Sequence, residues 1–358
     1  MAMLVWFLHA QVSIVGLKWP SHVKCLENER QALLNFKQGL NDDFGMLSTW
    51  TNTDCCQWRG IQCNNQTGHV QMLLLRGSNL RGPLLSGSLP QILTGVVNLT
   101  ILIHLQNMEY LDLSSNYFDG SQIPEHMGSF KSLRYLNLSY SGFSGTIPYE
   151  LGNLSKLEFL DLSFNFRSEM PTGFGFLDLS GNYGIYGEIP SQLGNLSQLR
   201  YLDLQNTSLS GAIPFQVGNL PILHTLRLYG LFGLKMKDAK WLSSLSLLTT
   251  LDLSSNNLIY SHNLLQSISE LIPNLRELSL AGCSLSDDNI STLFPSHSNF
   301  STSLSILDLS DNMLTSSTFQ LLLNYSLNLQ ELYLSHNNIV LSSPHYPNFP
   351  SLVILDLS

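Results

Sequence analysis

The sequence contains few charged residues and no concentration of positive charge. Only 12% of its 358 residues are charged, and the formal net charge is −9 at pH 7. Binding to a phosphate backbone depends on clustered Lys and Arg side chains, and no such cluster occurs. The composition therefore argues against a nucleic-acid partner and leaves cationic or neutral partners open.

Long apolar runs are also missing. Beyond the N-terminus, no segment has the ~20 uninterrupted apolar residues of a membrane-spanning helix, so any membrane anchor is expected outside this chain. Residues 1–24 are expected to be a secretory signal peptide. Their apolar stretch is interrupted by His9 and Gln11 and is preceded by no Lys or Arg, so a buried or disordered N-terminus remains the alternative.

The motifs of common catalytic sites are absent. The sequence has no G-x-S-x-G, no Gly-rich phosphate loop and no kinase signature, and its histidines follow no ligand spacing. A recurrent Asp invites a metal or acid–base role, but it belongs to a repeated Leu-Asp-Leu-Ser motif and is expected on a solvated face. We therefore predict a non-catalytic protein with no cofactor and no metal. The Asp recurs at Asp112, Asp161, Asp178, Asp203, Asp252, Asp308 and Asp356.

Cysteine is scarce and unevenly placed. Four of the five cysteines lie in the first 63 residues, at Cys25, Cys55, Cys56 and Cys63. This clustering suits two disulfides that staple a small cap in an oxidising compartment. A zinc site is the weaker interpretation, because adjacent Cys55 and Cys56 cannot easily both ligate one tetrahedral ion and no C-x2-C spacing occurs.

Hydrophobic residues, by contrast, make up 44% of the chain and recur in the pattern L-x-L-x-x-N-x-L. Each copy is expected to be a short strand whose two leucines point to one face, since side chains alternate along a strand. Stacked copies would bury a continuous leucine core under one parallel sheet, at roughly 1.5–3 kcal/mol per enclosed Leu. The first leucines of the copies are Leu73, Leu111, Leu136, Leu160, Leu177, Leu202, Leu226, Leu251, Leu278, Leu307, Leu332 and Leu355.

The sixth position of the motif is expected to be buried, with the Asn amide bonding backbone groups of the turn. Ser78, Ser141 and Thr207 can partly substitute there, whereas Leu231 cannot, so we expect a different turn near residues 229–232. Cys283 occupies the same position and is interpreted as a buried ladder residue rather than a reactive thiol. The Asn residues are Asn116, Asn165, Asn182, Asn256, Asn312 and Asn337.

Several copies carry a second half of the form L/F-x-G-x-I-P, as in residues 143–154 and 209–220. Gly permits a tight turn and Pro fixes an extended path on the convex side. Beyond about residue 220 this half is lost, which predicts more helical or irregular convex segments.

The N-terminal block predicts a cap built on an amphipathic helix. Ala32, Leu33, Phe36 and Leu40 would share its apolar face, and Asn28 with Gln31 resembles a capping box at its start. Trp50 and Trp58 are interpreted as part of the packing of this cap.

These motifs resemble those of plant-type extracellular leucine-rich-repeat proteins, and residues 25–40, 47–50 and 55–70 are similar to the N-terminal cap of receptor-like proteins of the ethylene-inducing-xylanase-receptor type. The resemblance implies an α/β solenoid, a leucine-rich-repeat superhelix with a parallel concave sheet and a disulfide-stapled cap. It also implies a cap over residues 25–70, repeats over residues 71–358, and Cys25–Cys55 and Cys56–Cys63 pairing.

For function, the resemblance implies ligand recognition at the plant cell surface or in the secreted space, in defence signalling. The ligand would be a peptide, protein or glycan, and a receptor kinase would supply the signal. The alternative is a secreted inhibitor similar to polygalacturonase-inhibiting proteins, which close with a cysteine-bearing cap. This chain stops at Ser358 inside a strand motif with no C-terminal cap, so we expect a fragment or truncated product.

Two steps between copies are irregular. The chain spends 38 residues between Leu73 and Leu111 but only 17 between Leu160 and Leu177. Either the solenoid bends at these points, or the coding sequence carries an insertion and a deletion.

Nine N-x-[ST] sequons predict a glycosylated, secreted surface, although several arise from the repeat itself and Asn137 lies within a predicted strand. They are Asn65, Asn98, Asn137, Asn153, Asn195, Asn206, Asn289, Asn299 and Asn324.

Ligand recognition is expected at the solvent-facing strand positions of the middle repeats, where aromatic and Arg side chains depart from the common motif. Arg227 and Tyr229 replace the usual Asp and Ser. The alternative for Tyr135, Phe159 and Tyr201 is that they only stack on neighbours along the sheet. The candidates are Tyr135, Asn137, Tyr140, Phe159, Phe164, Tyr201, Gln205, His224, Arg227 and Tyr229.

Overall fold

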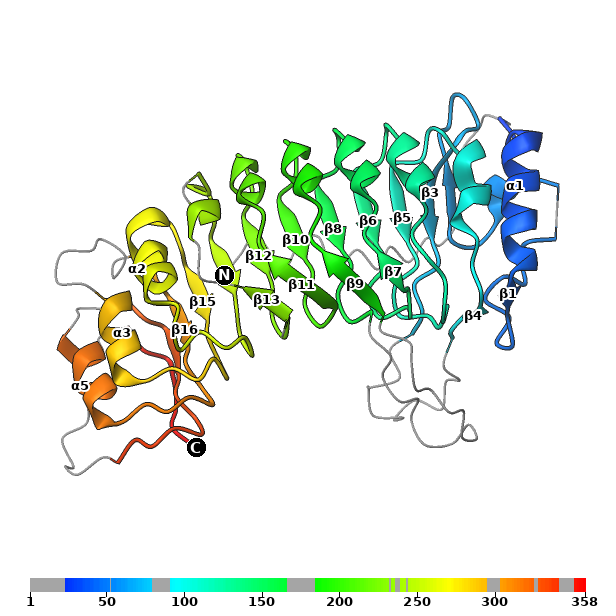
Figure 1. The fold of residues 1–358 in the computed structure, drawn as a ribbon. Helices are drawn as coiled ribbons and strands as arrows, with labels where there is room; N and C mark the ends of the chain where they lie inside the picture. The colour runs from blue at the N-terminus through cyan, green and yellow to red at the C-terminus, as the bar shows by residue number, and fades with distance from the viewer. Residues whose placement is uncertain are drawn as a thin grey trace.

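The chain forms a curved solenoid in which one long sheet runs from the N-terminal to the C-terminal end (Figure 1). This computed structural model describes residues 23–51, 53–78, 91–165, 184–231, 233–235, 239–242, 244–294, 303–324, 328–340 and 351–358. All but the last two residues of the expected signal peptide, 1–24, lie outside them. In the described part of the chain, every helix falls short of the length and apolarity that a bilayer crossing demands.

The long sheet follows the chain strand by strand. Its described strands are parallel, apart from the antiparallel pairing of β2 with β3. In spatial order they are β2 (Ile61–Cys63), β3 (Val70–Leu74), β5 (Tyr110–Asp112), β6 (Tyr135–Asn137), β8 (Phe159–Asp161), β10 (Tyr201–Asp203), β12 (Thr225–Arg227), β14 (Thr250–Asp252), β15 (Glu277–Ser279), β16 (Ile306–Asp308), β17 (Glu331–Tyr333) and β18 (Ile354–Asp356).

The predicted leucine ladder is confirmed. The first leucine of each repeat pairs with that of the next, as in Leu136 with Leu160 and Leu202 with Leu226. The described ladder leucines from Leu73 to Leu332 are almost completely buried. Because one repeat cannot enclose its own leucines, the stack of neighbours creates the core.

The Asn position forms the predicted second ladder at the repeats that the structure describes. Asn312 donates from Nδ2 to the carbonyls of Leu280 and Leu309 at 2.9 Å each, and its Oδ1 accepts the backbone N–H of Cys283 at 3.0 Å. Cys283 is buried in this ladder, as expected. At Leu231 only the backbone N–H joins the ladder, donating to Asn256 Oδ1 at 3.1 Å.

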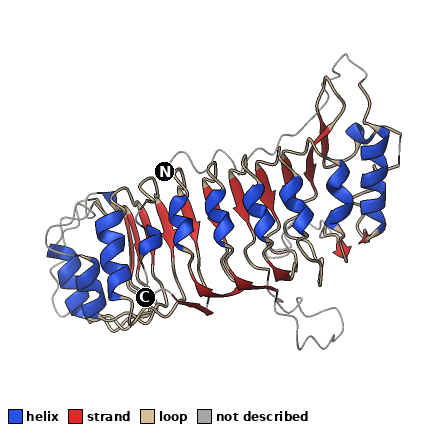
Figure 2. Ribbon diagram, turned by 45° about the horizontal axis from the view of Figure 1, so that its top comes forward, coloured by secondary structure: helices blue, strands red, loops and turns tan. Residues whose placement is uncertain are grey.

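The L-x-G-x-I-P halves, joined by one strand of the following repeat, form a second, smaller parallel sheet along one side of the solenoid (Figure 2). Its strands are β7 (Gly145–Thr146), β9 (Ile185–Glu188), β11 (Ser208–Ala212) and β13 (Gly233–Lys235). Gly187 has a φ of +91°, and a Cβ there would touch Thr146 of the preceding repeat. The motif therefore needs Gly for both conformation and space.

Short helices cover the convex side (Figure 2). Up to residue 242 they are 3₁₀ helices, and from residue 262 onward the convex helices are α-helices, as the sequence predicts. They are η2 (Leu99–His104), η3 (Glu125–Ser129), η4 (Tyr149–Asn153), η5 (Ser191–Asn195), η6 (Phe215–Asn219), η7 (Lys240–Leu242), α2 (His262–Leu271), α3 (Asp287–Leu293) and α5 (Ser316–Asn324).

At both irregular steps the strands on either side pair directly, which corrects one prediction. β8 pairs directly with β10, so the copy beginning at Leu177 does not lie between them, and Asn182 lies outside the described residues. A backbone hydrogen bond connects the two sides of residues 166–183: the N–H of Ile185 donates to the carbonyl of Asn165 at 3.0 Å. The longer step, between Leu73 and Leu111, likewise joins two neighbouring strands of the sheet, since β3 pairs with β5.

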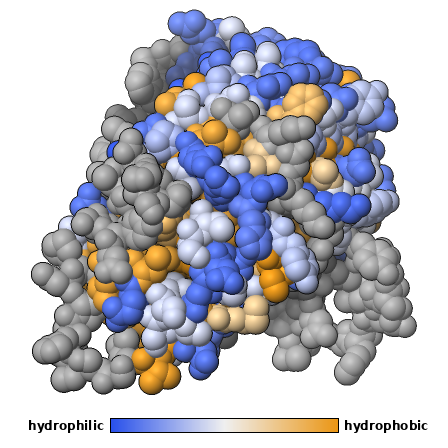
Figure 3. Space-filling view, turned by 60° about the vertical axis from the view of Figure 1, so that its left-hand side comes forward, coloured by the Kyte–Doolittle hydropathy of each residue, from blue (hydrophilic) through white to orange (hydrophobic). Residues whose placement is uncertain are grey.

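At the C-terminal end the solenoid shows hydrophobic patches among hydrophilic ones (Figure 3). β18 is the last strand of the sheet, and Leu355 is 37% exposed where Leu332 in the preceding strand is 0% exposed. The leucine ladder is thus enclosed only where a neighbour stacks on both sides.

The N-terminal cap consists of α1 (Glu27–Gln38), η1 (Cys55–Gln57) and the β2–β3 hairpin. Ala32, Leu33 and Phe36 are buried as predicted. The predicted capping box is wrong: α1 begins at Glu27, after Leu26, and has no side-chain cap. Leu40 is not on the helix but in β1 (Leu40–Asn41), which pairs with β4 (Thr94–Gly95).

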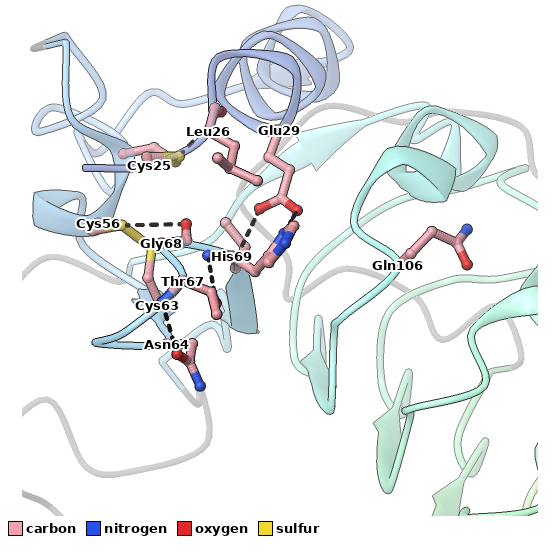
Figure 4. Close-up of polar contacts among 12 residues, drawn as sticks. Cys25, Leu26, Glu29, Cys56, Cys63, Asn64, Thr67, Gly68, His69 and Gln106 are labelled. Atoms are coloured by element: carbon pink, nitrogen blue, oxygen red, sulfur yellow. Dashed lines mark hydrogen bonds and ion pairs between the residues drawn. A yellow bond between two sulfur atoms is a disulfide. The ribbon is translucent and has the colours of Figure 1, made fainter. Parts of the chain in front are cut away.

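Two disulfides staple this cap, Cys25–Cys55 and Cys56–Cys63, with the pairing that the resemblance implies. The sulfurs of Cys25, Cys55 and Cys63 lie within 4.8 Å of one another, but a disulfide sulfur is no longer a thiolate ligand. Glu29 points from α1 toward His69 beside these bridges (Figure 4). Trp50 stacks on Trp58 at 5.1 Å in the core of the cap, as expected.

Candidate functional site

The concave surface is made by the strand residues on either side of each ladder leucine. Because side chains alternate, the residue before the leucine and the residue after it both face away from the core. In-register pairing then aligns equivalent residues of successive repeats into columns. The two columns across β5 to β12 define the concave patch, which consists of Tyr110, Asp112, Tyr135, Asn137, Phe159, Asp161, Tyr201, Asp203, Thr225 and Arg227.

The first column is a ladder of stacked aromatic rings. Tyr135 and Phe159 are 4.3 Å apart between ring centroids, Phe159 and Tyr201 are 4.4 Å apart, and Tyr110 extends the ladder at 6.1 Å from Tyr135. These residues do stack on their neighbours, as the alternative raised from the sequence supposes, and their contact with a ligand stays a prediction. Their ring faces cover each other, so a ligand would meet their edges.

The second column is polar and more buried than the sequence predicts. Asp112 and Asp203 are 8% and 1% exposed, so a fully solvated row of carboxylates is wrong at these two positions. The cause is local: each carboxylate accepts the backbone N–H two residues later, Ser114 for Asp112 and Gln205 for Asp203, both at 3.0 Å. The recurrent Asp thus stabilises the turn that follows its strand.

Asp203 is the centre of a polar network in the patch. Its Oδ2 accepts the hydroxyl of Tyr201 at 2.9 Å and the side-chain amide of Gln205 at 3.1 Å. Nη1 of Arg227 lies 4.0 Å from the same oxygen, and the guanidinium lies 6.0 Å from the centroid of the Tyr201 ring. Burial and the neighbouring Asp161 raise the pKa of Asp203 to about 7.

Asn137 takes the place of the Asp on β6. Its Oδ1 accepts the N–H of Ser139 at 3.0 Å and its Nδ2 donates to the hydroxyl of Tyr135 at 3.2 Å. The pair Tyr135–Asn137 therefore repeats the geometry of Tyr201–Asp203 without a charge.

Five of the ten candidate residues lie outside the strands, contrary to expectation, and two of these five are aromatic residues of the turns. Tyr140 and Phe164 occupy the turn after β6 and β8, have φ values of +52° and +54°, and stack at 4.0 Å. A left-handed backbone is rare for bulky aromatic residues and costs on the order of 1 kcal/mol or more each. They form a ridge along one edge of the concave surface.

The remaining candidates flank the patch. Tyr229 and Gln205 follow β12 and β10 and are partly exposed. His224 precedes β12 at the opposite edge, where its Nδ1 lies 2.7 Å from the carbonyl of Ile222. The structure therefore brings the candidates onto adjacent repeats of one surface. Sequence reasoning did not place five patch residues among the candidates, although aligning the columns would have found them: Tyr110, Asp112, Asp161, Asp203 and Thr225.

Glycosylation remains a prediction at the exposed sequons Asn65, Asn98, Asn153 and Asn195, and at the partly exposed Asn206. The structure argues against it at two others. The side chain of Asn137 is buried and hydrogen-bonded to Ser139 and Tyr135. Asn289 is 1% exposed and closes the capping box of α3 with Ser286. Asn299 lies outside the described residues, as does the side chain of Asn324.

Comparison with known families supports this architecture. Residues 26–64 match the leucine rich repeat N-terminal domain, and residues 107–130, 132–154, 198–220 and 328–352 match the leucine rich repeat. Receptor-like protein EIX1 of Solanum lycopersicum is 33% identical over 324 residues, covering 88% of this chain. The chain belongs to the receptor-like leucine-rich-repeat proteins. EIX2 of the same plant is 53% identical over 125 residues, covering 35% of this chain and 12% of that protein.

This receptor-like chain spans about a quarter, 24%, of the length of EIX1. Among solved structures, the ectodomain of the Arabidopsis receptor kinase HAESA, in complex with an IDA peptide hormone, is similar with a TM-score of 0.53 and 27% identity, covering 88% of this chain and 50% of that one. A plant ice-binding protein is similar with a TM-score of 0.57 and 23% identity, covering 94% and 96%. The latter likeness concerns the fold alone.

Proposed function

We propose that this chain is the ligand-recognising part of an extracellular receptor-like protein in plant defence, and that its concave patch contacts a peptide, protein or glycan. The observation that carries the proposal is the patch itself. Across β5 to β12, aromatic, Arg and buried Asp side chains form one continuous, hydrogen-bonded surface. Such clusters of aromatic and Arg side chains are typical of binding hot spots.

The relatives support the same role. EIX1 and EIX2 are receptor-like proteins, a non-catalytic class, and HAESA holds its peptide ligand on a similar ectodomain. HAESA has also been solved with the co-receptor SERK1. We therefore assign signalling to a separate receptor kinase and place the protein in the secretory pathway, on the outer side of the plasma membrane or secreted.

The test compares matched double variants of the secreted chain. Fractions of fungal culture filtrate would be screened for binding by biolayer interferometry, and the active fraction titrated against Arg227→Ala/Tyr229→Ala and against Tyr186→Ala/Phe215→Ala. The second pair is exposed outside the patch, on β9 and η6. The first pair should weaken binding by at least ~2 kcal/mol with an unchanged melting temperature. Loss of binding in the second pair alone would move the site away from the patch.

A further inference from the structure

Two carboxyl groups lie side by side within the concave patch. Asp161 and Asp203 are Cα partners on β8 and β10. Each accepts the backbone N–H two residues later at 3.0 Å, from Ser163 and Gln205, so the two side chains hold the same orientation. Adjacent strands lie about 4.8 Å apart, which places the two carboxyls close together on a surface where Asp203 is 1% exposed.

The groups that face Asp203 come from three strands. Asp161 faces it from β8, the hydroxyl of Tyr201 donates to it from its own strand at 2.9 Å, and Arg227 approaches from β12 to 4.0 Å. On the far side of Arg227, Glu277 of β15 and Asp252 of β14 add negative charge. Arg227 is therefore the positively charged side chain nearest to the Asp203 carboxyl.

Two like charges that are both desolvated cannot easily ionise together. The pKa of Asp203 is raised mainly by burial, and next by the negative charge of the neighbouring Asp161. Burial also raises the pKa of Asp161. The pair therefore retains a proton at pH values where isolated carboxyl groups have lost theirs.

We propose that this carboxyl pair gates Arg227, so that the patch binds a carboxylate of an acidic peptide more strongly when the pair holds a proton. The inference rests on the proposed function and specifies the chemistry of the ligand. With Asp203 ionised, its charge offsets that of the guanidinium. With the proton on Asp203, that carboxyl no longer offsets the charge of Arg227, whose side chain is 37% exposed and can donate to a carboxylate of the ligand.

The chain itself shows how to test the gate without breaking the fold. Asn137 occupies the equivalent position on β6 and keeps the bond from the N–H of Ser139 and a bond to the hydroxyl of Tyr135. Asp203→Asn should therefore keep the backbone bond of the turn and remove the ionisable group, together with the bond that Asp203 accepts from the side-chain amide of Gln205. Asp308→Asn, on β16, is the matched control, since Asp308 also accepts the N–H two residues later.

The probe is tetraglutamate, whose carboxyl groups are ionised at both pH 5.5 and pH 8.5. Isothermal titration should give binding to the unaltered chain that is about tenfold tighter at pH 5.5, the usual effect of one charge-assisted hydrogen bond. Asp203→Asn should bind tightly at both pH values, Arg227→Gln weakly at both, and Asp308→Asn like the unaltered chain. Tetralysine should show no such preference for low pH.

A second measurement follows the gate without any ligand. The ¹⁵Nε resonance of Arg227 should shift with pH in the unaltered chain and stay constant in Asp203→Asn. A resonance that does not titrate overturns the proposal, as does tetraglutamate affinity that is absent or equal at the two pH values. If the resonance titrates while Arg227→Ala/Tyr229→Ala leaves binding of the filtrate fraction intact, the proposed function fails and the gate stands.

Discussion

The carboxylate of Glu29 in α1 lies 2.7 Å from Nδ1 of His69, forty positions away in the chain. The same carboxylate accepts the backbone N–H of Val70 at 2.7 Å, and Glu29 is 1% exposed. Val70 begins β3, the first strand of the parallel ladder. Glu29 therefore attaches the cap helix to the point where the repeats begin.

We expect Glu29→Ala to destabilise the cap by about 2 kcal/mol, because it leaves the N–H of Val70 buried without an acceptor. Glu29→Gln keeps an acceptor oxygen and should lose less. Thermal unfolding with the disulfides intact measures both, with Glu27→Ala, on the exposed side of the helix, as the control. Equal melting temperatures for all variants would mean that the disulfides alone hold α1 in place.

Gly152 is expected to tolerate no side chain. In η4 it faces η5 of the next repeat, and a Cβ would overlap the carbonyl oxygen of Gln192. Gly152→Ala should cost roughly 1–3 kcal/mol, since overpacking forces the two repeats apart. Lys156→Ala, exposed just beyond η4 and outside the Asn153 sequon, should cost almost nothing. Chemical denaturation compares the two, and a stable Gly152→Ala would show that the repeats can separate freely.

Asp203 makes stability depend on pH. Its pKa is raised to about 7 in the folded chain, above the ~3.9 of an unfolded Asp, so between these values the folded state binds more protons. Its contribution is complete below pH ~4 and is lost as the pH rises through about 7. Asp203→Asn should remove this loss, so the stability of the variant relative to the unaltered chain should rise by on the order of 4 kcal/mol between pH 4 and pH 8. Melting temperatures across this range test it, and parallel profiles for the two proteins would contradict it.

The thiol of Cys283 should not react with alkylating reagents in the folded protein. It is buried in the Asn ladder, its Sγ lies 3.3 Å from the carbonyl of Leu253, and burial raises its thiol pKa to about 12. Because the thiolate is the nucleophile, iodoacetamide at pH 8 should not label it until the chain is unfolded. Labelling in the native state, read by mass spectrometry, would show that the ladder opens there.

Deleting residues 166–183 should leave the solenoid intact. β8 already pairs with β10, and Ile185 bonds Asn165 across the segment. Joining Asn165 to Gly184 gives a repeat in which they match Ser141 and Gly142 in sequence. Shortening the connection between β8 and β9 lowers the entropy cost of closing it, so the melting temperature should stay equal or rise slightly. A collapse in stability would show that the segment supports the fold.

The repeat pattern was sufficient to predict the sheet, the buried leucines and the Asn ladder. Alternation along a strand sends the two leucines of each copy inward, whichever repeat they belong to, and the fixed spacing of the Asn after the strand places it in the following turn. The cysteine cluster likewise indicated a stapled cap. The start of α1 was missed, because Leu26 precedes the helix without any capping side chain that a sequence pattern could reveal.

The contacts between neighbouring repeats could not be predicted from strand periodicity. Leu160 and Leu177 begin nearly identical motifs, and only pairing with the neighbouring strands places Leu160 in the ladder beside Leu202. The stacking of Phe159 on Tyr201 and the burial of Asp203 beside Asp161 also join residues more than forty positions apart. The sequence by itself determined which side chains face the core and which face the concave surface, because that depends on strand periodicity alone. The tertiary structure decided which of those surface groups share a desolvated environment, because contact across strands depends on how the repeats are stacked.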